Sequence, residues 1–203
     1  MDVITEREVP QGGELRVAAG TIVTPAARDL ARARGVRIVE GTGEGQTIAL
    51  GADHGGFRLK ETLKPVFREL GYEVCDVGVH EEKPVDYPDI AQQVAELVAQ
   101  GKTARGVIID GAGIGSAMAA NKVPGIRAAL CYDRASARNS REHNDANVLT
   151  LGGRLLTPSQ AEEVLRTWLG TPFAGGRHTA RIQKISAIEK RYSSWTPRNS
   201  SSS

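Results

Sequence analysis

From residue 47 onward, short apolar runs alternate with longer amphipathic segments. The runs have strand length, are rich in β-branched and other apolar residues, and cover residues 47–51, 72–77, 106–110, 126–131 and 147–151. The amphipathic segments have helical spacing and cover residues 57–70, 87–100, 116–121, 134–142, 158–169 and 178–192. Such alternation predicts an α/β fold over residues 47–192: a doubly wound, Rossmann-like parallel sheet with helices on both faces.

The starts and faces of the helices support this register. Thr157 followed by Pro158 offers a capping hydroxyl and then a proline at the first helical position, where the missing N–H costs little. In the last helix Ile182, Ile185 and Ile188 recur every three residues, which gives an apolar stripe. The stripe would pack on the core or on a partner, and we expect the core.

Residues 1–46 look like a separate extension, because the glycine-rich stretch 41–45 is typical of a linker. Short strands are expected at 14–18 and 36–39, around a helix at 26–34 that starts after Thr24-Pro25. An extension of this size buries little surface, so it should pack on a small core of its own or serve as a targeting segment that a larger assembly recognises. Residues 193–203 are rich in serine and are expected to form a disordered tail.

Length, charge and cysteine spacing argue against several classes of protein. The 203 residues suffice for one full domain with an appendage, and 26 Lys+Arg against 24 Asp+Glu leave a net charge of +2, which argues against a nucleic-acid surface. Cys75 and Cys131 lie in apolar runs without zinc-site spacing, so both should be buried. The start lacks a signal-peptide pattern, and no apolar run approaches the length of a membrane span, about 20 residues. We therefore expect a cytoplasmic protein with no membrane partner.

A glycine-spaced turn, Asp110-Gly-Ala-Gly-Ile-Gly115, joins the predicted strand 106–110 to a helix. Such a turn presents backbone N–H groups to an anion, whereas the carboxylate of Asp110 suggests chemistry as well as binding. Three further clusters stand at expected element ends: Asp53-His-Gly-Gly56, His143-Asn-Asp145 after a helix, and Gly175-Gly-Arg-His178. Together the four clusters predict one shared cleft.

With these motifs in order, residues 47 to about 192 resemble the family of type B ribose-5-phosphate isomerases and galactose-6-phosphate isomerase subunits. The motifs that carry the resemblance are Gly51-Ala-Asp-His-Gly-Gly56, Asp86-Tyr-Pro88, Gly111 to Gly115 with Ala119-Ala-Asn-Lys122, Arg141-Glu-His-Asn144, Gly152-Gly-Arg154 and Gly175-Gly-Arg-His178. The resemblance implies a homodimer or a dimer of dimers with shared active sites, no metal and no cofactor. It also implies aldose–ketose isomerisation of a sugar phosphate through an enediol, with D-ribose 5-phosphate and D-ribulose 5-phosphate as the expected pair.

The resemblance also assigns roles to residues. His143 would open the sugar ring, since imidazole both gives and takes protons near neutral pH. The other substrate-binding residues are expected to contact hydroxyls, the enediol and the phosphate, and comprise Asp53, His54, Gly111, Ala112, Gly113, Ile114, Gly115, Asn144, Arg154, Arg177 and Arg181. The three arginines would hold the phosphate, because a guanidinium matches paired oxygens.

The chain departs from the family at the base. One branch has cysteine where Asp110 stands and another has glutamate where Ser116 stands, while Ala112 replaces a hydroxyl-bearing residue. Asp110 could itself act as the catalytic base. A second hypothesis follows from the similarity of Asp110 to the A subunit of galactose-6-phosphate isomerase: a non-catalytic or partner-dependent subunit that binds a sugar phosphate. A third is an isomerase for another aldose phosphate.

The extension carries a resemblance of its own. Val3-Ile-Thr-Glu6, Gly20-Thr-Ile-Val-Thr-Pro25 and Arg34-Gly-Val-Arg-Ile38 look like segments attached to enzymes of bacterial microcompartments. That resemblance implies a shell protein or a co-encapsulated enzyme as partner, and a location inside a bacterial microcompartment.

Overall fold

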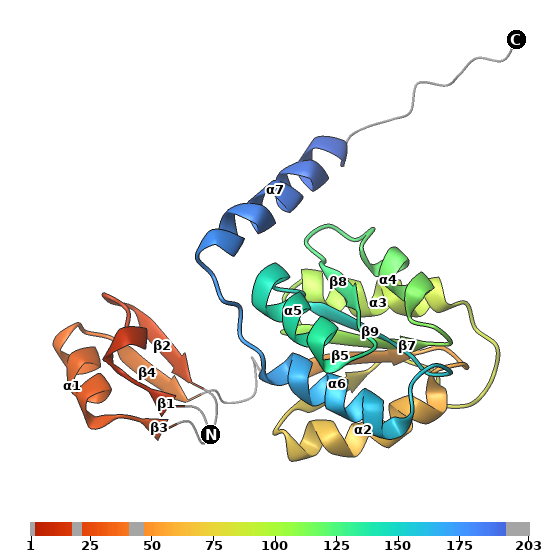
Figure 1. Cartoon of the computed structure of the whole chain (residues 1–203), viewed down its shortest axis with the longest axis horizontal. Helices are drawn as coiled ribbons and strands as arrows, with labels where there is room; N and C mark the ends of the chain where they lie inside the picture. The colour runs from red at the N-terminus through yellow and green to blue at the C-terminus, as the bar shows by residue number, and fades with distance from the viewer. Residues whose placement is uncertain (1–2, 18–21, 41–46, 194–203) are drawn as a thin grey trace, which may run out of the picture.

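The computed structural model describes residues 3–17, 22–40 and 47–193. The predicted linker at 41–45 and nearly all of the predicted tail lie outside these residues. Within them the elements separate into a small N-terminal unit and a sheet domain (Figure 1).

The N-terminal unit is built from two parallel strand pairs and one helix. β1 (Val3–Ile4) pairs with β3 (Ile22–Val23), and β2 (Glu14–Val17) pairs with β4 (Arg37–Glu40). Helix α1 (Pro25–Ala33) begins after Thr24, whose hydroxyl accepts from the Ala27 amide at 3.2 Å, and a single 3-10 turn covers Glu6–Glu8. Its buried side chains are Val9, Val17, Val23, Ala27, Ala31 and Val36. The unit therefore packs on a core of its own, and the sequence predicted β2, β4 and α1 but neither β1 nor β3.

The sheet domain contains five parallel strands in the order β6-β5-β7-β9-β8. Their bounds are Thr47–Ala52 for β5, Glu73–Asp76 for β6, Arg105–Asp110 for β7, Ala128–Leu130 for β8 and Val148–Gly152 for β9. Every residue of β9, and all but the first of β5 and β7, is buried, as expected for strands covered on both faces. The chain leaves β5 toward β6 on one side and returns to β7 on the other. The sheet thus has a switch point between β5 and β7.

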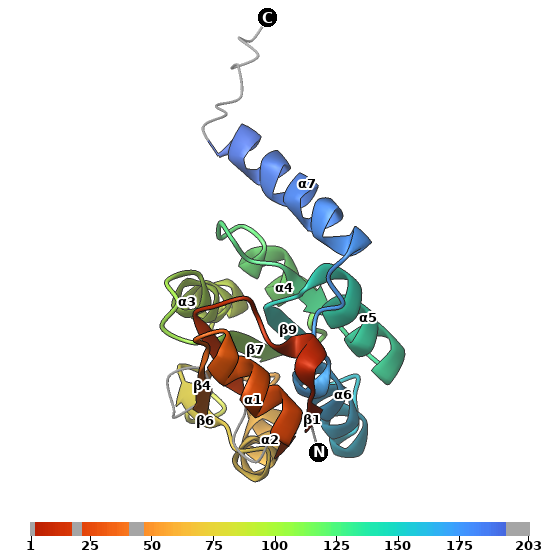
Figure 2. The same cartoon turned by 90° about the vertical axis from the view of Figure 1, so that its left-hand side faces the viewer.

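Helices cover both faces of the sheet (Figures 1 and 2). The helices are α2 (Phe57–Glu69), α3 (Tyr87–Ala99), α4 (Ile114–Ala120), α5 (Arg134–Asn144) and α6 (Pro158–Gly170). One core cluster joins α2, α5 and α6 to the sheet, and the other joins α3 and α4 to its opposite face. The predicted doubly wound α/β fold is confirmed.

Two helix boundaries matter for the site. Helix α4 begins at Ile114 rather than at residue 116, so Ile114 and Gly115 belong to its first turn and Gly113 is its N-cap. Helix α5 continues to Asn144, so His143 and Asn144 lie in its last turn, whereas the sequence placed them after the helix. The preceding sequence lacks a helix breaker, and the helix stops at Asp145, which adopts φ 45°.

Two burial predictions were wrong. Helix α7 (Arg177–Tyr192) leaves the body of the sheet domain, as both views show, and its Ile185 and Ile188 are 45% and 57% exposed rather than packed on the core (Figures 1 and 2). Helix α7 contacts α5, and the carboxylate of its Glu189 accepts a hydrogen bond from the amide of Gly125. Cys131 is buried as predicted, but Cys75 is only half-buried because it lies on the edge strand β6.

Candidate active site

The loops that follow β5 and β7 meet at the switch point. The amide of Asp53, just after β5, donates to the carbonyl of Ile109 at 3.2 Å. A Cβ on Gly56 would lie 2.0 Å from that same carbonyl oxygen, and a Cβ on Gly55 would lie 3.1 Å from the amide nitrogen of Gly111. Only glycine permits this approach of two backbones, so the glycines of the first motif are needed to close the site.

The loop after β7 is organised around the carboxylate of Asp110, which is only 4% exposed. Its Oδ1 accepts from the amides of Ala112, at 2.7 Å, and Gly113. Its Oδ2 accepts from the amide of Ser116 at 3.0 Å and from the Ser116 hydroxyl at 2.5 Å. A carboxylate has about four lone-pair positions, and four donors occupy them here. Asp110 therefore fixes the turn that leads into α4.

Other side chains complete this loop. Gly113 adopts φ 80°, and the hydroxyl of Tyr132 donates to the carbonyl of Ala112 at 2.9 Å. The ring of Tyr87 covers Gly115, where a Cβ would lie 2.5 Å from it, and the side chain of Arg154 lies against Gly111. Neither tyrosine was assigned a role from the sequence, although Tyr87 stands in the quoted Asp86–Pro88 turn.

Asp53 and His54 directly follow β5, next to the end of β7. Asp53 Oδ1 accepts from the Gly56 amide at 3.0 Å. His54 Nδ1 is buried and has no hydrogen-bond partner within the described part of the chain. A buried ring nitrogen without a partner is costly, so His54 Nδ1 is available to accept a hydrogen bond from a ligand or to donate one to it. We call the residues of this edge the carboxyl-edge cluster: Asp53, His54, Asp110 to Ser116, and Arg154.

A second cluster surrounds the end of α5. The rings of His143 and His178 stack with centroids 4.3 Å apart and an interplanar angle of 7°. The side-chain amide of Asn139 lies 2.8 Å from His143 Nδ1, and its oxygen is 3.5 Å from the Asn144 side-chain nitrogen. In that orientation Asn139 donates to Nδ1, so a neutral His143 carries its proton on Nε2. Asn139 stands four residues before His143, a helical spacing that could have revealed it.

Charged side chains hold the turn after α5 in place. Asp145 accepts from Arg141 at 2.7 Å and from Arg127 at 3.2 Å. Arg141 also donates to the carbonyl of Ala146 and lies over the ring of Trp168, which has Arg105 over it as well. This partly buried network fixes where α5 ends, and hence where His143 and Asn144 stand.

The start of α7 adds the remaining cations. Arg177 Nε lies 3.4 Å from His178 Nε2, and Arg181 follows one helical turn later. Burial lowers the pKa of His178, and the charges of His143, Arg177 and Arg181 lower this pKa further. We call these residues the amino-edge cluster: Asn139, His143, Asn144, Arg177, His178 and Arg181.

The two clusters lie at opposite ends of the parallel strands. Asn147, three residues after the end of α5, accepts from Gly106 at the start of β7, whereas Gly153 donates to Asp110 at its end. A strand of this length spans about 16 Å at the usual rise per residue. Within one chain the four motifs therefore form two groups, because the end of α5 precedes a strand and the loop after β7 follows one. The shared cleft stays a prediction, and it requires clusters from two copies of the chain.

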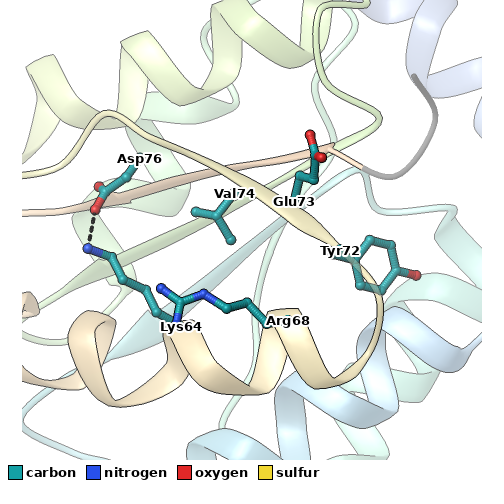
Figure 3. A pocket seen from close by; sticks show the side chains of 6 residues that line it. All are labelled: Lys64, Arg68, Tyr72, Glu73, Val74 and Asp76. Carbon is teal, nitrogen blue, oxygen red and sulfur yellow. Dashed lines mark ion pairs between the residues drawn. The ribbon is translucent and has the colours of Figure 1, made fainter. Parts of the chain in front are cut away.

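One hollow lies away from both clusters, between α2 and the edge strand β6 (Figure 3). Its volume is about 480 Å³, and it is lined by Lys64, Arg68, Tyr72, Glu73, Val74 and Asp76. Lys64 pairs with Asp76 at 2.6 Å, and Asp76 also pairs with the buried Lys60. Burial opposes ionisation of Asp76, but the two lysines outweigh it and lower its pKa. This hollow contains none of the predicted site residues.

No group of three or more His, Cys, Asp or Glu side chains among the described residues is placed to hold a metal ion. None of the helices in the described ranges has the length and apolar character needed to cross a bilayer.

Comparison with known proteins extends over the sheet domain and α7. The Ribose/Galactose Isomerase family profile matches residues 48–185. The ribose-5-phosphate isomerase B of Escherichia coli is 45% identical over 144 residues, covering 71% of this chain and 97% of that protein. A ribose-5-phosphate isomerase B structure from Clostridium thermocellum is 50% identical with a TM-score of 0.71, covering 72% of this chain and 99% of that one. One from Mycoplasma genitalium with bound ribulose-5-phosphate is 38% identical with a TM-score of 0.68, covering 71% and 96%.

Proposed function

Because the chain belongs to the ribose/galactose isomerase family, we propose that this sugar-phosphate isomerase interconverts D-ribose 5-phosphate and D-ribulose 5-phosphate through an enediol. Its similarity to type B ribose-5-phosphate isomerases over nearly the whole of their length carries the proposal. The reaction moves a proton between the first and second carbons, so it needs a ring opener, a base and donors to the developing oxyanion.

The amino-edge cluster supplies the ring opener. With Nδ1 of His143 engaged by Asn139, Nε2 is the nitrogen left for the sugar. Its N–H can hydrogen-bond to the ring oxygen and stabilise the charge that develops there, while the anomeric proton passes to that oxygen by way of solvent, which opens the ring to the aldehyde. Arg177 and Arg181, one turn apart at the start of α7, would bind the phosphate oxygens in forked pairs.

The carboxyl-edge cluster supplies the oxyanion donors. Ala112, Gly113 and Ser116 already donate their amides to Asp110, whereas the amides of Gly111 and Gly115 find no acceptor among the described residues. These free N–H groups are fixed before substrate arrives, which is the condition under which such donors lower a barrier most.

A complete site needs both clusters, so the proposal includes a homodimer, or a dimer of dimers. A ribose phosphate is shorter than the sheet that separates the clusters of one chain, and the amino-edge cluster of one copy would complete the carboxyl-edge cluster of another. The exposed Ile185 and Ile188 on α7 give that helix an apolar surface for the contact.

The first experiment follows conversion of ribose 5-phosphate by the purified chain, with His143→Asn alongside. The proposal expects turnover by the wild type and a loss of about 10²-fold or more in the variant, the range of general acid–base catalysis. Saturable binding of the sugar phosphate without turnover would favour the partner-dependent subunit suggested by Asp110 and Ala112. Turnover of a longer aldose phosphate alone would change the substrate but keep the chemistry.

The N-terminal unit supports a proposal on location. It lies outside the family-matched residues, has a core of its own and exposes Val3 and Ile22 side by side on β1 and β3. We propose that it docks the enzyme to a microcompartment shell protein or to a co-encapsulated enzyme in the cytoplasm. Fusing residues 1–46 to a fluorescent protein tests this: recruitment to shells is expected, and diffuse fluorescence in shell-forming cells would overturn it.

A further inference from the structure

The isomerisation requires a base at the second carbon, and the geometry of Asp110 leaves it poorly suited to that task. Three backbone amides and the Ser116 hydroxyl occupy its two oxygens, and Ser116 is fully buried. To accept a proton from carbon, Asp110 would have to lose one of the bonds that shape the loop. The charge is held for structure, in the way a capping carboxylate holds a helix start.

Asp53 stands beside Asp110 at the switch point. The last residue of β5, Ala52, is in register with Ile109, so Asp53 is the neighbour of Asp110 on the adjacent strand. Its carboxylate makes one hydrogen bond, from the Gly56 amide to Oδ1, and Oδ2 has no partner within the described residues. The group is 7% exposed, so Oδ2 is largely shielded from water yet still accessible to a substrate.

Three other acidic or thiol groups near this end of the sheet are buried or engaged elsewhere. Cys131 is fully buried, and burial raises the pKa of its thiol. Asp133 caps α5, where the amide of Ser136 lowers its pKa. Asp76 is paired with two lysines. Unlike these three groups, Asp53 has an oxygen without a partner among the described residues, and its backbone joins the end of β7, next to the Gly111–Gly115 loop.

We propose that Asp53 is the catalytic base and that Asp110 is a positioning residue that holds the Gly111–Gly115 loop, whose amides face the oxyanion. This inference rests on the proposed isomerase function. Asp53 Oδ2 takes the proton from the second carbon of the open aldose; the C–H electron pair forms the C1–C2 double bond, and the aldehyde oxygen takes up the negative charge and then a proton from solvent. Asp53 returns its proton to the first carbon while the hydroxyl on the second carbon releases its proton to solvent, giving the ketose with no oxidant or reductant.

The test compares Asp53→Asn, Asp53→Glu and Asp110→Asn with the wild type, using ribose 5-phosphate and proton exchange at its second carbon. Asp53→Asn should lower kcat and exchange by about 10²-fold or more and remove the acidic limb of the kcat–pH profile. Asp53→Glu should keep that limb at a reduced kcat. Asp110→Asn should lower kcat and thermal stability together, because the amide cannot accept from all four donors, but keep the limb.

Two failures are distinguishable. An inactive, folded wild type would overturn the proposed function and this inference with it. An active wild type with an Asp53→Asn variant that exchanges the proton within a few-fold of normal would overturn the inference alone. So would loss of the acidic limb in Asp110→Asn instead of Asp53→Asn, because that result would return the proton transfer to Asp110. Circular dichroism of each variant shows that the comparison is between folded proteins.

Discussion

The two edges of the sheet hold their functional groups by different means. At the carboxyl edge, backbone meets backbone: the chain around Gly56 touches the carbonyl of Ile109, and amides 112, 113 and 116 wrap one carboxylate. At the amino edge, side chain meets side chain: a histidine stack, an asparagine that links two site residues, and arginines on a helix that leaves the domain. The first arrangement is rigid before substrate arrives, whereas the second depends on rotamers and on what packs against α7.

The largest effect should come from a pair of variants, each of which inactivates one of the two clusters. Asp53→Asn and His143→Asn should each lose about 10²-fold or more of kcat/KM when pure, because each removes one acid–base group. Mixed after co-refolding, the two variants should recover about one quarter of wild-type activity, since half of the dimers are mixed and each of those has one intact site.

Wild-type mixtures serve as the reference for that recovery. Failure of the mixed variants to exceed either parent would mean that each chain completes its own site, and the proposed sharing would be wrong.

The next largest effect concerns backbone contact. Gly56→Ala should lower the free energy of unfolding by about 3 kcal/mol, because its Cβ would overlap the Ile109 carbonyl. The amino-edge counterpart, Gly176→Ala, has nothing within 4 Å of the new Cβ and should cost about 1–2 kcal/mol, from its backbone conformation of φ 53° and ψ −128° alone. Urea unfolding of both measures the difference, and equal costs would show that the carboxyl edge is no more tightly built.

A smaller effect should follow from Asn139→Leu, which removes the donor to His143 Nδ1. One hydrogen bond is worth about 1 kcal/mol, so kcat/KM should fall about 5-fold. Asn139→Asp should instead favour the protonated ring and move the pH optimum upward. Nitrogen NMR of His143 reports the tautomer directly, and an unchanged spectrum in Asn139→Leu would remove Asn139 from the mechanism.

The smallest effect concerns pH and stability. The folded pKa of His178 lies below its ordinary value of 6.5, because burial lowers it, the charges of His143, Arg177 and Arg181 lower it further, and Glu142 opposes them. In the window between the two values the unfolded chain binds more protons, so stability rises with pH there and is lost as pH falls from about 6.5. His178→Phe keeps a ring for stacking and should flatten this slope between pH 5 and 7, measured by thermal unfolding. A slope unchanged by His178→Phe would assign it to another group.

Periodicity predicted the sheet domain well, because strands 47–51, 106–110 and 147–151 are apolar on both faces and only a covered parallel sheet accommodates that. The motif residues were identifiable from the sequence, but their division between the two edges of the sheet was not predicted. Helix and strand order alone places the end of α5 at the amino edge, so the signal for the separation was present. The hydrogen bonds to Asp110 could not be predicted, because they depend on how the following loop of small residues folds back onto the Asp110 carboxylate. The exposure of α7 was not predicted, because an apolar stripe of isoleucines has the same sequence pattern whether it packs on its own chain or on another copy.

The placement of complementary halves at opposite ends of one sheet constrains how copies can assemble. A two-fold axis lets each copy give one half and receive the other, so both sites fill and growth stops. The same complementarity in a head-to-tail arrangement leaves one unfilled half at each end, and a further copy can always be added. Whether copies of this enzyme form a closed assembly would therefore depend on the surface of α7 and not on the reacting residues. A change there that preserves both clusters but spoils the two-fold contact would turn a discrete enzyme into a fibre.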